Sequence, residues 1–308
     1  MKKFAIAIHG GAGTIDRNKM TAEKEAAYRA ALSDAITAGE NVLMSGGSSL
    51  DAVEAAVVSL ENCPLFNAGK GSVFTHDGTH EMDAAIMRGD NLMAGAAAGI
   101  RGVQNPVVLA RTIMEKSEHV LLSRDGAEDF ARSQNLPFQS DDYFHDDFRH
   151  QQWQQALVDD RVSLDHASEK KFGTVGAVAI DQFGNLAAAT STGGMTNKRW
   201  GRIGDSPIIG SGTYANNETC AISCTGHGEF FIRSVVAYDV SCLMEYRGMT
   251  LEEACQIVVN EKLVKIGGEG GLIAIDHKGN ICLPFNSSGM YRAWKKQGDE
   301  CQVKIYKD

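Results

Sequence analysis

The sequence contains no long apolar stretch. No window approaches the roughly 18 apolar residues that a membrane-spanning helix requires, so we expect no membrane segment. In the opening residues, MKKFAIAIHGGAG, the apolar stretch runs only from Phe4 to Ile8 before a glycine-rich turn. This pattern predicts a first strand rather than a signal peptide, and we therefore expect a cytoplasmic protein.

Basic residues are too few and too scattered for a nucleic-acid surface. Lysine and arginine total 30 against 39 aspartates and glutamates, which gives a formal net charge of −9, and no basic run could follow a phosphate backbone. The 7 cysteines are an odd number and include no CxxC pair. We interpret them as reduced core residues.

Several catalytic and cofactor motifs are absent or incomplete. His9-Gly-Gly resembles the oxyanion turn of lipase-type esterases, but no GxSxG occurs, and the nearest segment, 204–208, fails at its last position. No GxGxxG joins a strand to a helix, which argues against a dinucleotide fold. His76 and His80 have metal-like spacing, yet the Asp-Gly pair between them predicts a turn between strands.

Glycine is the residue in excess, at 33 of 308 positions, and its clusters indicate places where the backbone approaches something closely. The length and the 43% hydrophobic content suffice for one large core or two smaller ones. Apolar periodicity and capping residues predict strands at 4–8, 71–75, 81–88 and 92–100, and helices at 21–45, from 48 onward, near 106–116, near 125–133, at 229–246 and at 251–263.

The second half contains an internal repeat. Residues 176–185 and 271–280 both read G-x-x-A-I-D-x-x-G-N, which predicts an alternating strand, a tight turn and a return strand. Two hairpins of one design, with paired helices beside them, predict stacked sheets in a layered α/β sandwich rather than a doubly wound sheet. From about 135 to 172 the chain is polar and charged, and about 155–173 is predicted to be a flexible linker.

Thr174 is the candidate nucleophile, because it follows a glycine at the end of this linker and begins a strand-like segment. A threonine hydroxyl needs a base, and no histidine or lysine is suitably spaced around it. Cleavage of the Gly173–Thr174 bond would supply one, since a free α-amine has a reference pKa of about 7.7 to 8.0. An ordinary strand threonine is the alternative that the Gly-Thr pair alone leaves open.

Two more threonines are predicted to lie beside this nucleophile. The hairpin returns Thr190 and Thr192 to the beginning of the Thr174 strand, and both point to the same face of the return strand. The alternative is that these hydroxyls only bond backbone groups of a turn.

Charged and glycine-rich segments follow. Arg202 and Asp205 could grip a carboxylate and an ammonium three residues apart, or could form a mutual surface salt bridge instead. Residues 225–228, TGHG, precede a predicted helix, where free N–H groups and the helix dipole favour an anionic oxygen. A plain glycine-rich helix start is the alternative there.

In chain order, the segments HGGAG, FNAGKGSVF, GTVGAVAID, ATSTGG, GRIGDSP, YANN and SCTGHGE resemble the plant-type L-asparaginase and isoaspartyl peptidase family, bacterial branch. Its members are N-terminal-nucleophile hydrolases, and the match covers residues 4 to about 293. The resemblance implies an α+β fold, a four-layer αββα sandwich, as a single hydrolase domain over 1–308. It also implies self-cleavage into an α chain, 1–173, and a β chain, 174–308, which assemble as (αβ)₂.

The resemblance implies a role for each matching residue. Thr174 is the nucleophile, freed by cleavage after Gly173, and Thr192 orients its hydroxyl. The other site residues that it implies are the substrate clamp, Arg202 and Asp205, the oxyanion site, Thr225 and Gly226, the substrate's amino end, Gly228, and Asn67, whose role is less specific. It implies no catalytic cofactor, but a structural sodium ion on backbone carbonyls of a loop with Leu60, Glu61, Cys63, Phe66, Ala68 and Lys70.

The implied reaction releases L-aspartate from L-asparagine or from isoaspartyl (β-aspartyl) dipeptides, which share one reacting unit. The α-amine of Thr174 would take the hydroxyl proton, a β-aspartyl ester would form, and water would release aspartate. His227 stands where some members have a small residue, at the rim of the pocket. Two alternatives stay open, a glycosylasparaginase-like amidase and an uncleaved relative that only binds amino acids.

Overall fold

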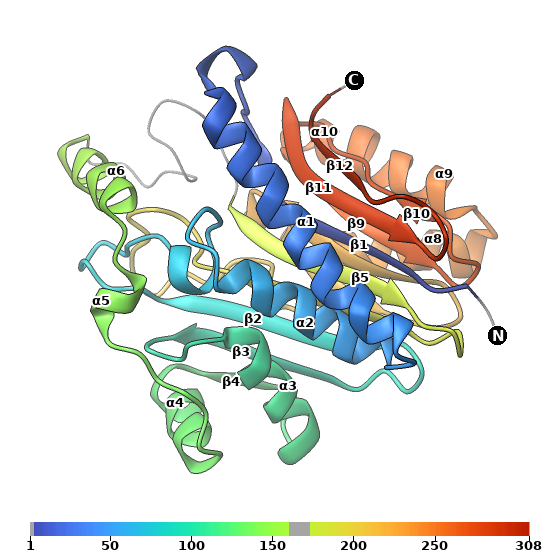
Figure 1. Ribbon diagram of the computed structural model, residues 1–308, viewed down its shortest axis with the longest axis horizontal. Coiled ribbons are helices and arrows are strands. Elements are labelled where there is room, and N and C mark those ends of the chain that lie inside the picture. Colours follow the sequence, from blue (N-terminus) through green and yellow to red (C-terminus); the bar gives the residue numbers. More distant parts are fainter. Residues whose placement is uncertain (1–2, 160–172, 308) are drawn as a thin grey trace.

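Two β-sheets organise the protein in a computed structural model that describes residues 3–159 and 173–307 (Figure 1). The larger sheet has the strand order β12-β11-β1-β5-β6-β2-β3-β4, and the smaller has the order β10-β9-β8-β7. The strands are β1 Ala5–Gly13, β2 Met82–Arg88, β3 Ala94–Ile100, β4 Leu121–Ser123, β5 Thr174–Ile180, β6 Leu186–Thr192, β7 Thr213–Ala215, β8 Cys220–Gly226, β9 Gly270–Asp276, β10 Ile281–Cys282, β11 Gly289–Lys296 and β12 Gln302–Tyr306.

Helices cover both sheets, and the predicted mixed α/β class is confirmed. Their bounds are α1 Ala22–Met44, α2 Ser49–Glu61, α3 Pro106–Lys116, α4 Arg124–Ser133, α5 Asp141–Phe144, α6 Asp147–Val158, α7 Gly228–Ser234, α8 Val236–Arg247, α9 Leu251–Gln256 and α10 Leu263–Lys265. Short 3₁₀ turns occupy Arg17–Lys19 and Gly69–Gly71, and a π-helical turn at Ile257–Lys262 joins α9 to α10.

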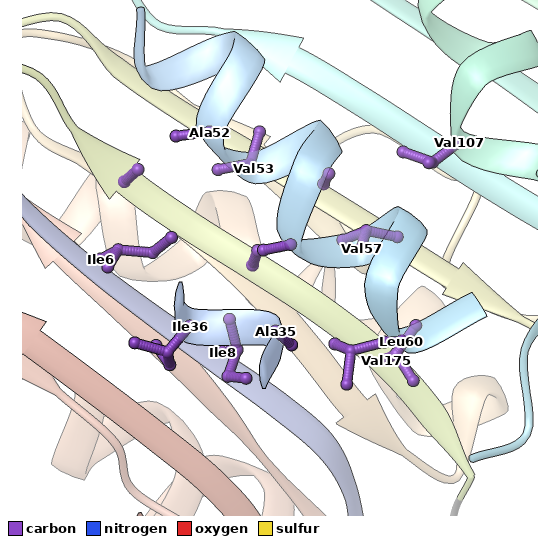
Figure 2. Close-up of a cluster of buried hydrophobic side chains, with 14 of the residues drawn as sticks. Ile6, Ile8, Ala35, Ile36, Ala52, Val53, Val57, Leu60, Val107 and Val175 are labelled. Carbon is purple, nitrogen blue, oxygen red and sulfur yellow. The ribbon is translucent and has the colours of Figure 1, made fainter. Parts of the chain in front are cut away.

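Alternating side chains of the central strands form two cores. In β1, Ile6 and Ile8 pack toward α1 and α2, whereas Ala5 and Ala7 pack toward the smaller sheet. Figure 2 shows Val53, Val57 and Leu60 of α2 lying over Ile6, Ile8 and Val175 of the larger sheet. Every residue of β1 and β5 is buried, as expected for strands that are covered on both faces.

The layers follow from these contacts. Helices α1 and α2 lie across one face of the larger sheet, and β8 and β9 pack against β1, β5 and β6 on its other face. Helices α8 and α9 cover the outer side of the smaller sheet. The strand β5, which begins at the candidate nucleophile, therefore lies in the interior between α2 and β8.

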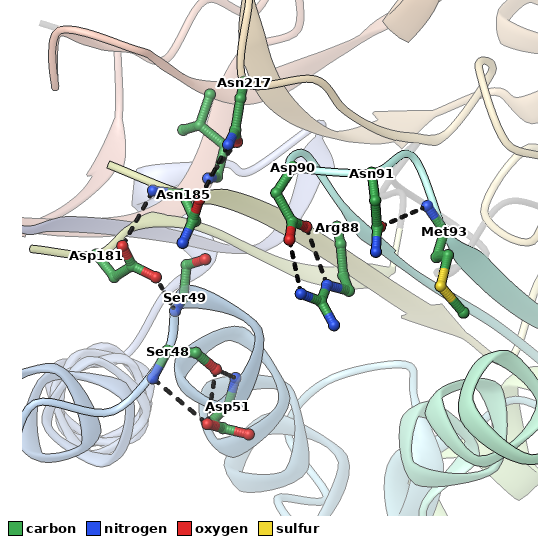
Figure 3. Close-up of polar contacts among 11 residues, drawn as sticks. Ser48, Ser49, Asp51, Arg88, Asp90, Asn91, Met93, Asp181, Asn185 and Asn217 are labelled. Carbon is green, nitrogen blue, oxygen red and sulfur yellow. Dashed lines mark hydrogen bonds and ion pairs between the residues drawn. The ribbon is translucent and has the colours of Figure 1, made fainter. Parts of the chain in front are cut away.

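The internal repeat has a physical cause in its aspartates. Asp181 Oδ1 accepts hydrogen bonds from two N–H groups of its own turn, at 2.9 and 3.0 Å, and Asp276 Oδ1 does the same at 2.9 and 2.8 Å. The first hairpin is β5–β6 in the larger sheet and the second is β9–β10 in the smaller, so the predicted hairpins in stacked sheets are confirmed. Asp181 Oδ2 also accepts from Ser49 N at the start of α2, as Figure 3 shows.

The helix α6 corrects the prediction of a polar, linker-like segment. Its Trp153 ring stacks on Phe74 at 5.5 Å between centroids, and the side chains of Arg149 and Gln152 are buried. Gln155–Val158 of the predicted linker 155–173 belong to this helix, so the linker prediction is wrong for them. Residues 160–172 of that prediction lie outside the described residues. Sequence periodicity missed α6 because its buried face contains polar side chains.

Two other predictions also fail locally. The strand predicted at 71–75 is instead a 3₁₀ turn at Gly69–Gly71, followed by an isolated bridge from Thr75 to Lys198. The predicted helix 229–246 is broken into α7 and α8 at Val235, whose φ of 49° and ψ of 48° are left-handed. Positive φ is costly for a β-branched residue, so local backbone strain is stored at this break.

Replacing Val235 by glycine should relieve this strain. The side chain of Val235 is 43% exposed, so little apolar burial is lost, and glycine tolerates the left-handed conformation. We expect Val235→Gly to raise the free energy of unfolding by about 1 kcal/mol, measured by urea denaturation. Arg233→Gly, at an exposed helical position, is the control and should lower it by about 1 kcal/mol. A loss of equal size in both variants would contradict the strain.

Candidate active site

The hairpin of β5 and β6 brings the predicted threonines together. Thr174 is the first residue of β5 and pairs across the ladder with Thr192, the last residue of β6. Thr174 Oγ1 donates a hydrogen bond to Thr192 Oγ1 at 3.1 Å, and Thr192 Oγ1 donates to the carbonyl oxygen of Gly173, also at 3.1 Å. The hydroxyl of Thr174 is thus linked through Thr192 to the carbonyl of Gly173, the residue directly before Thr174.

A glycine turn fixes Thr192, and Asn67 fixes this turn. Gly194 N donates to Thr192 Oγ1 at 2.9 Å, and the Gly194 carbonyl accepts from Asn67 Nδ2 at 2.7 Å. Gly193 N donates to the Asn67 carbonyl at 3.0 Å, and a Cβ at Gly193 would lie 2.3 Å from Asn67 Oδ1. Asn67 therefore contacts Thr192 indirectly, through the turn at Gly193 and Gly194. The sequence did not indicate this contact.

A small pocket that is open to solvent lies beside these threonines. Three predicted site residues do not line the pocket but lie next to residues that do: Thr225, Gly228 and Asn67. The pocket is lined by Gly173, Thr174, Thr192, Gly194, Met195, Arg202, Gly204, Asp205, Ser206 and Gly226.

Asp205 supplies an unpaired acid to this pocket. Its side chain is 5% exposed, and Oδ2 has no hydrogen-bond partner within the described part of the chain. Burial raises the pKa of this carboxyl to about 7, although the nearby charge of Arg202 acts to lower it. A buried acceptor without a partner is energetically costly, and a bound cation would relieve that cost.

Arg202 does not pair with Asp205, so the mutual salt bridge considered from the sequence is not what forms. Arg202 Nε and Nη2 instead donate to the two carboxylate oxygens of Glu229, each at 2.9 Å. Bidentate pairing of this kind holds a guanidinium in one orientation. It leaves Nη1 beside the pocket-lining Gly194 and Gly204, where a Cβ would lie 3.6 and 2.9 Å from it.

Sequence reasoning missed Glu229. Its position in the first turn after the TGHG segment was the available signal, but nothing in the spacing links it to Arg202. Burial acts to raise the pKa of Glu229, yet the hydrogen bond from Arg202 and its charge hold the pKa below its ordinary value. His227 Nδ1 lies 3.6 Å from Glu229 Oε2.

Gly228 is required by both clamp residues. A Cβ at this position would lie 2.8 Å from Asp205 Oδ1 and 2.9 Å from Arg202 Nη2. Contacts this short would force Asp205 or Arg202 to move, so only glycine fits. Gly228 thus lies against Asp205 and Arg202, and its implied place at the substrate's amino end stays a prediction.

Thr225 and Gly226 end strand β8 beside the pocket. Thr225 is fully buried, and its Oγ1 accepts a hydrogen bond from the N–H of Ala12 at 3.3 Å. Because Ala12 N–H is a donor, the proton of Thr225 remains able to donate. Ala12 belongs to the HGGAG segment, which thus contacts the end of β8 through this hydrogen bond.

The 60–70 loop surrounds two glycines with backbone carbonyls. A Cβ at Gly69 would lie 2.4 Å from the Glu61 carbonyl oxygen, and one at Gly71 would lie 2.1 Å from that of Phe66 and 2.6 Å from that of Pro64. Neutral oxygen donors of this type suit a hard cation rather than a transition metal.

The two histidines with metal-like spacing have separate partners. His76 Nδ1 bonds Asn197 Oδ1 at 2.8 Å, and His80 Nδ1 bonds the Ser72 carbonyl at 3.0 Å. Within residues 3–159 and 173–307, no three His, Cys, Asp or Glu side chains form a group that could hold a metal ion. The turn predicted between these histidines is present at residues 76–78.

Comparison with known proteins shows the family of the chain. The protein family described as asparaginase matches residues 2–305. The chain belongs to the asparaginase family. An isoaspartyl peptidase of Salmonella typhimurium is 55% identical over 313 residues, which span 100% of both chains. An isoaspartyl peptidase of Escherichia coli is 53% identical over 100% of this chain and 98% of its own.

This asparaginase-family chain also matches eukaryotic proteins over nearly its whole length. An isoaspartyl peptidase/L-asparaginase of Xenopus laevis is 43% identical over 304 residues, 99% of this chain and 96% of its own. The resemblance inferred from the sequence is thereby confirmed. None of the helices in the described ranges is long and apolar enough to cross a membrane. The expected cytoplasmic location stays a prediction.

Proposed function

We propose that this asparaginase-family protein hydrolyses isoaspartyl dipeptides and L-asparagine, and that it releases L-aspartate through the N-terminal threonine Thr174. The observation that carries the proposal is the hydrogen-bonded series from Thr174 Oγ1 through Thr192 Oγ1 to the Gly173 carbonyl, beside a pocket with one arginine and one unpaired acid. The printed names of the bacterial and animal relatives support the same substrates.

Self-cleavage is the first step of the proposal. Thr174 Oγ attacks the carbonyl carbon of Gly173, which the Thr192 hydroxyl polarises through its hydrogen bond. The Gly173–Thr174 C–N bond breaks, the nitrogen takes the proton that the Thr174 hydroxyl loses, and an ester links Gly173 to the Thr174 oxygen. Water hydrolyses this ester and leaves the two chains 1–173 and 174–308, with a free amine on Thr174.

Substrate turnover reuses the same hydroxyl. The Thr174 amine takes the hydroxyl proton as the oxygen attacks the β-carbonyl carbon, and ammonia or a peptide amine leaves with a proton. Thr225 donates to the oxyanion, with Gly226 beside it. Asp205 receives the substrate α-ammonium, and Arg202 Nη1 receives the α-carboxylate. Water then releases aspartate.

The family fold and assembly belong to the same proposal. The two packed sheets between helices support a four-layer αββα sandwich of the N-terminal-nucleophile type. An exposed aromatic stripe on α8, with Tyr238 at 37% and Tyr246 at 67% exposure, supports a contact between two copies in an (αβ)₂ assembly. A sodium ion on the 60–70 loop would bind backbone carbonyls such as those of Glu61 and Phe66. It would thereby fix the loop that contains Asn67.

The test is a side-by-side assay with a β-aspartyl dipeptide and L-asparagine, which measures aspartate release by protein that mass spectrometry shows to begin a chain at Thr174. We expect turnover of both substrates. Preferential hydrolysis of a glycosylated asparagine would favour a glycosylasparaginase-like amidase. A chain that stays intact and binds aspartate without turnover would favour the amino-acid-binding alternative.

The pKa of Asp205 predicts the pH dependence of substrate capture. The carboxylate must be ionised to bind the α-ammonium, and its pKa in the free enzyme is raised to about 7. The ionised fraction therefore falls from about nine-tenths at pH 8 to about one-tenth at pH 6, and kcat/KM should fall at least about tenfold over this range. Steady-state kinetics from pH 5.5 to 8.5 measure this decrease of kcat/KM toward low pH.

Asp205→Asn is the control for this pH dependence. The variant should have a higher KM and a lower kcat/KM for both substrates, because the α-ammonium is common to them. Its kcat/KM should keep only the pH dependence that comes from the Thr174 amine. If the pH dependence of kcat/KM is unchanged in Asp205→Asn, another group controls substrate capture.

A further inference from the structure

His9 is a buried histidine that the proposed reaction does not use. It lies in β1 and is fully buried, next to the nucleophile strand. Burial lowers the pKa of its imidazole to about 3, although its bond to the Thr174 carbonyl acts in the opposite direction. The ring is therefore neutral at any pH at which the enzyme works, and one of its nitrogens carries no proton.

The hydrogen-bond partners determine which nitrogen this is. His9 Nδ1 lies 3.0 Å from the carbonyl oxygen of Thr174, and a carbonyl can only accept, so Nδ1 carries the proton. The unprotonated Nε2 must then accept, and Ser223 Oγ at 2.9 Å is its donor. A hydroxyl has only one proton, so Ser223 has none left for another partner.

The same reasoning orients the next two hydroxyls. Thr190 Oγ1 lies 2.6 Å from Ser223 Oγ and must donate to it, in preference to the Gly212 carbonyl at 3.2 Å. Since the Thr190 proton is used in this way, Thr213 Oγ1 donates to Thr190 Oγ1 at 2.7 Å, in preference to the Ser206 carbonyl at 3.0 Å. All four side chains are fully buried, so water does not compete. The protons run in one direction, from Thr213 through Thr190, Ser223 and His9 to the Thr174 carbonyl.

The carbonyl of Thr174 lies beyond the end of the β1–β5 ladder, so it has no backbone hydrogen-bond donor from β1 in that ladder. The β1–β5 ladder ends at the pair His9–Gly176, and the register of β1 with β11 shifts between His9 and Ala12. The imidazole supplies the donor beyond the end of the ladder. Gly176 makes room for it, since a Cβ there would lie 1.9 Å from Ser223 Oγ and 2.5 Å from His9 Nε2.

We propose that His9 is a positioning residue, which holds the nucleophilic Thr174 by its main-chain carbonyl, and that Ser223, Thr190 and Thr213 keep its ring in the tautomer that can do so. The inference rests on the proposed function, because it gives a role to the position of Thr174. Once the bond after Gly173 is cut, Thr174 is a chain end that is held from its C-terminal side, by its pairing with Thr192 and through its hydroxyl. Misplacement of a reacting group by about 1 Å costs about 10²-fold in rate.

Kinetics of three substitutions test this role. His9→Asn keeps an N–H donor near the position of Nδ1, His9→Gln places its amide nearer to Ser223, and His9→Leu has no donor. We expect His9→Leu and His9→Gln to lower kcat by about 10- to 10²-fold with KM changed little, and His9→Asn to retain kcat within about fivefold. Rates are compared per mole of protein with a free Thr174. Equal losses of kcat in all three variants would overturn the proposal.

A spectroscopic test is independent of activity. In Thr174→Ala protein, which keeps the main-chain carbonyl, ¹⁵N NMR of labelled imidazoles should show His9 as a neutral ring with the proton on Nδ1 and no titration between pH 5 and 9. His80 should give a similar signal, because burial lowers its pKa to about 4 and its Nδ1 bonds the Ser72 carbonyl. The His9→Asn substitution in the same background assigns the His9 signal by its loss. A His9 signal with the proton on Nε2, or a titration near pH 6.5, would overturn the proposal even if the proposed hydrolysis is correct.

Discussion

Thr174→Ala should remain a single chain of 308 residues. It should also release no aspartate above background from either substrate. Both steps of the proposed mechanism use the Thr174 hydroxyl, so its removal abolishes the cleavage and the turnover together. Loss of a nucleophile in another hydrolase lowers kcat by about 10⁶-fold, and we expect a loss of similar scale here. Intact-mass spectrometry measures the cleavage, and aspartate release measures the turnover.

Thr174→Ser is the control for this result. It keeps the hydroxyl that donates to Thr192 and loses only the methyl group, so it should still cleave itself and turn over substrate, more slowly. Thr174 is buried and its hydroxyl is hydrogen-bonded, so Thr174→Ala should lower the free energy of unfolding by about 1 kcal/mol, and both variants should still fold. An alanine variant that still divides after Gly173 would refute the assignment of the nucleophile.

Thr225→Val should lower kcat by about 10²- to 10³-fold while KM changes little. The valine side chain has nearly the same volume, so the change removes the hydroxyl alone. In the structure this oxygen accepts from Ala12 N–H and keeps its proton for another acceptor. Loss of one oxyanion donor has this effect in other hydrolases, because the bond is stronger in the transition state than in the bound substrate. Steady-state kinetics on protein already cleaved after Gly173 measure it.

The Ala12 bond is lost in the same variant, and a matched control separates the two effects. Thr219→Val removes another buried hydroxyl next to β8, which bonds Ser241 Oγ at 2.6 Å, far along the strand from Thr225. It should lower stability by about 1 kcal/mol and leave kcat unchanged. A sharp rise of KM in Thr225→Val with kcat preserved would make Thr225 a ground-state binding residue, and the oxyanion donor would then be the Gly226 N–H.

Much of the fold and the centre of the site were predictable because they are local in sequence. The β5–β6 hairpin follows from strand alternation and the Asp-x-x-Gly-Asn turn, in which Asp181 bonds the N–H groups of its own loop. A hairpin register places Thr192 opposite Thr174 without knowledge of the rest of the chain. The capping boxes at Ser48 and Thr250 predicted helix starts for the same reason.

What could not be predicted depends on residues far apart in the sequence. The partner of Arg202 was not predicted, because Glu229 lies 27 residues away and nothing in the spacing links the two. The helix α6 escaped notice because Arg149 and Gln152 occupy positions where periodicity expects apolar side chains. The bond between His9 and the carbonyl of Thr174 spans 165 residues, and no local pattern indicates it.

Gly173 lines the pocket as well as preceding the nucleophile. In the uncut chain its carbonyl also takes the hydrogen bond of Thr192. On the proposed mechanism, the protein is therefore the first substrate of its own site, and an uncut molecule is inhibited by its own backbone. Turnover should begin only as fast as this internal inhibitor is released. A freshly made sample should show a lag, whose duration is that of one bond cleavage and does not change with substrate concentration.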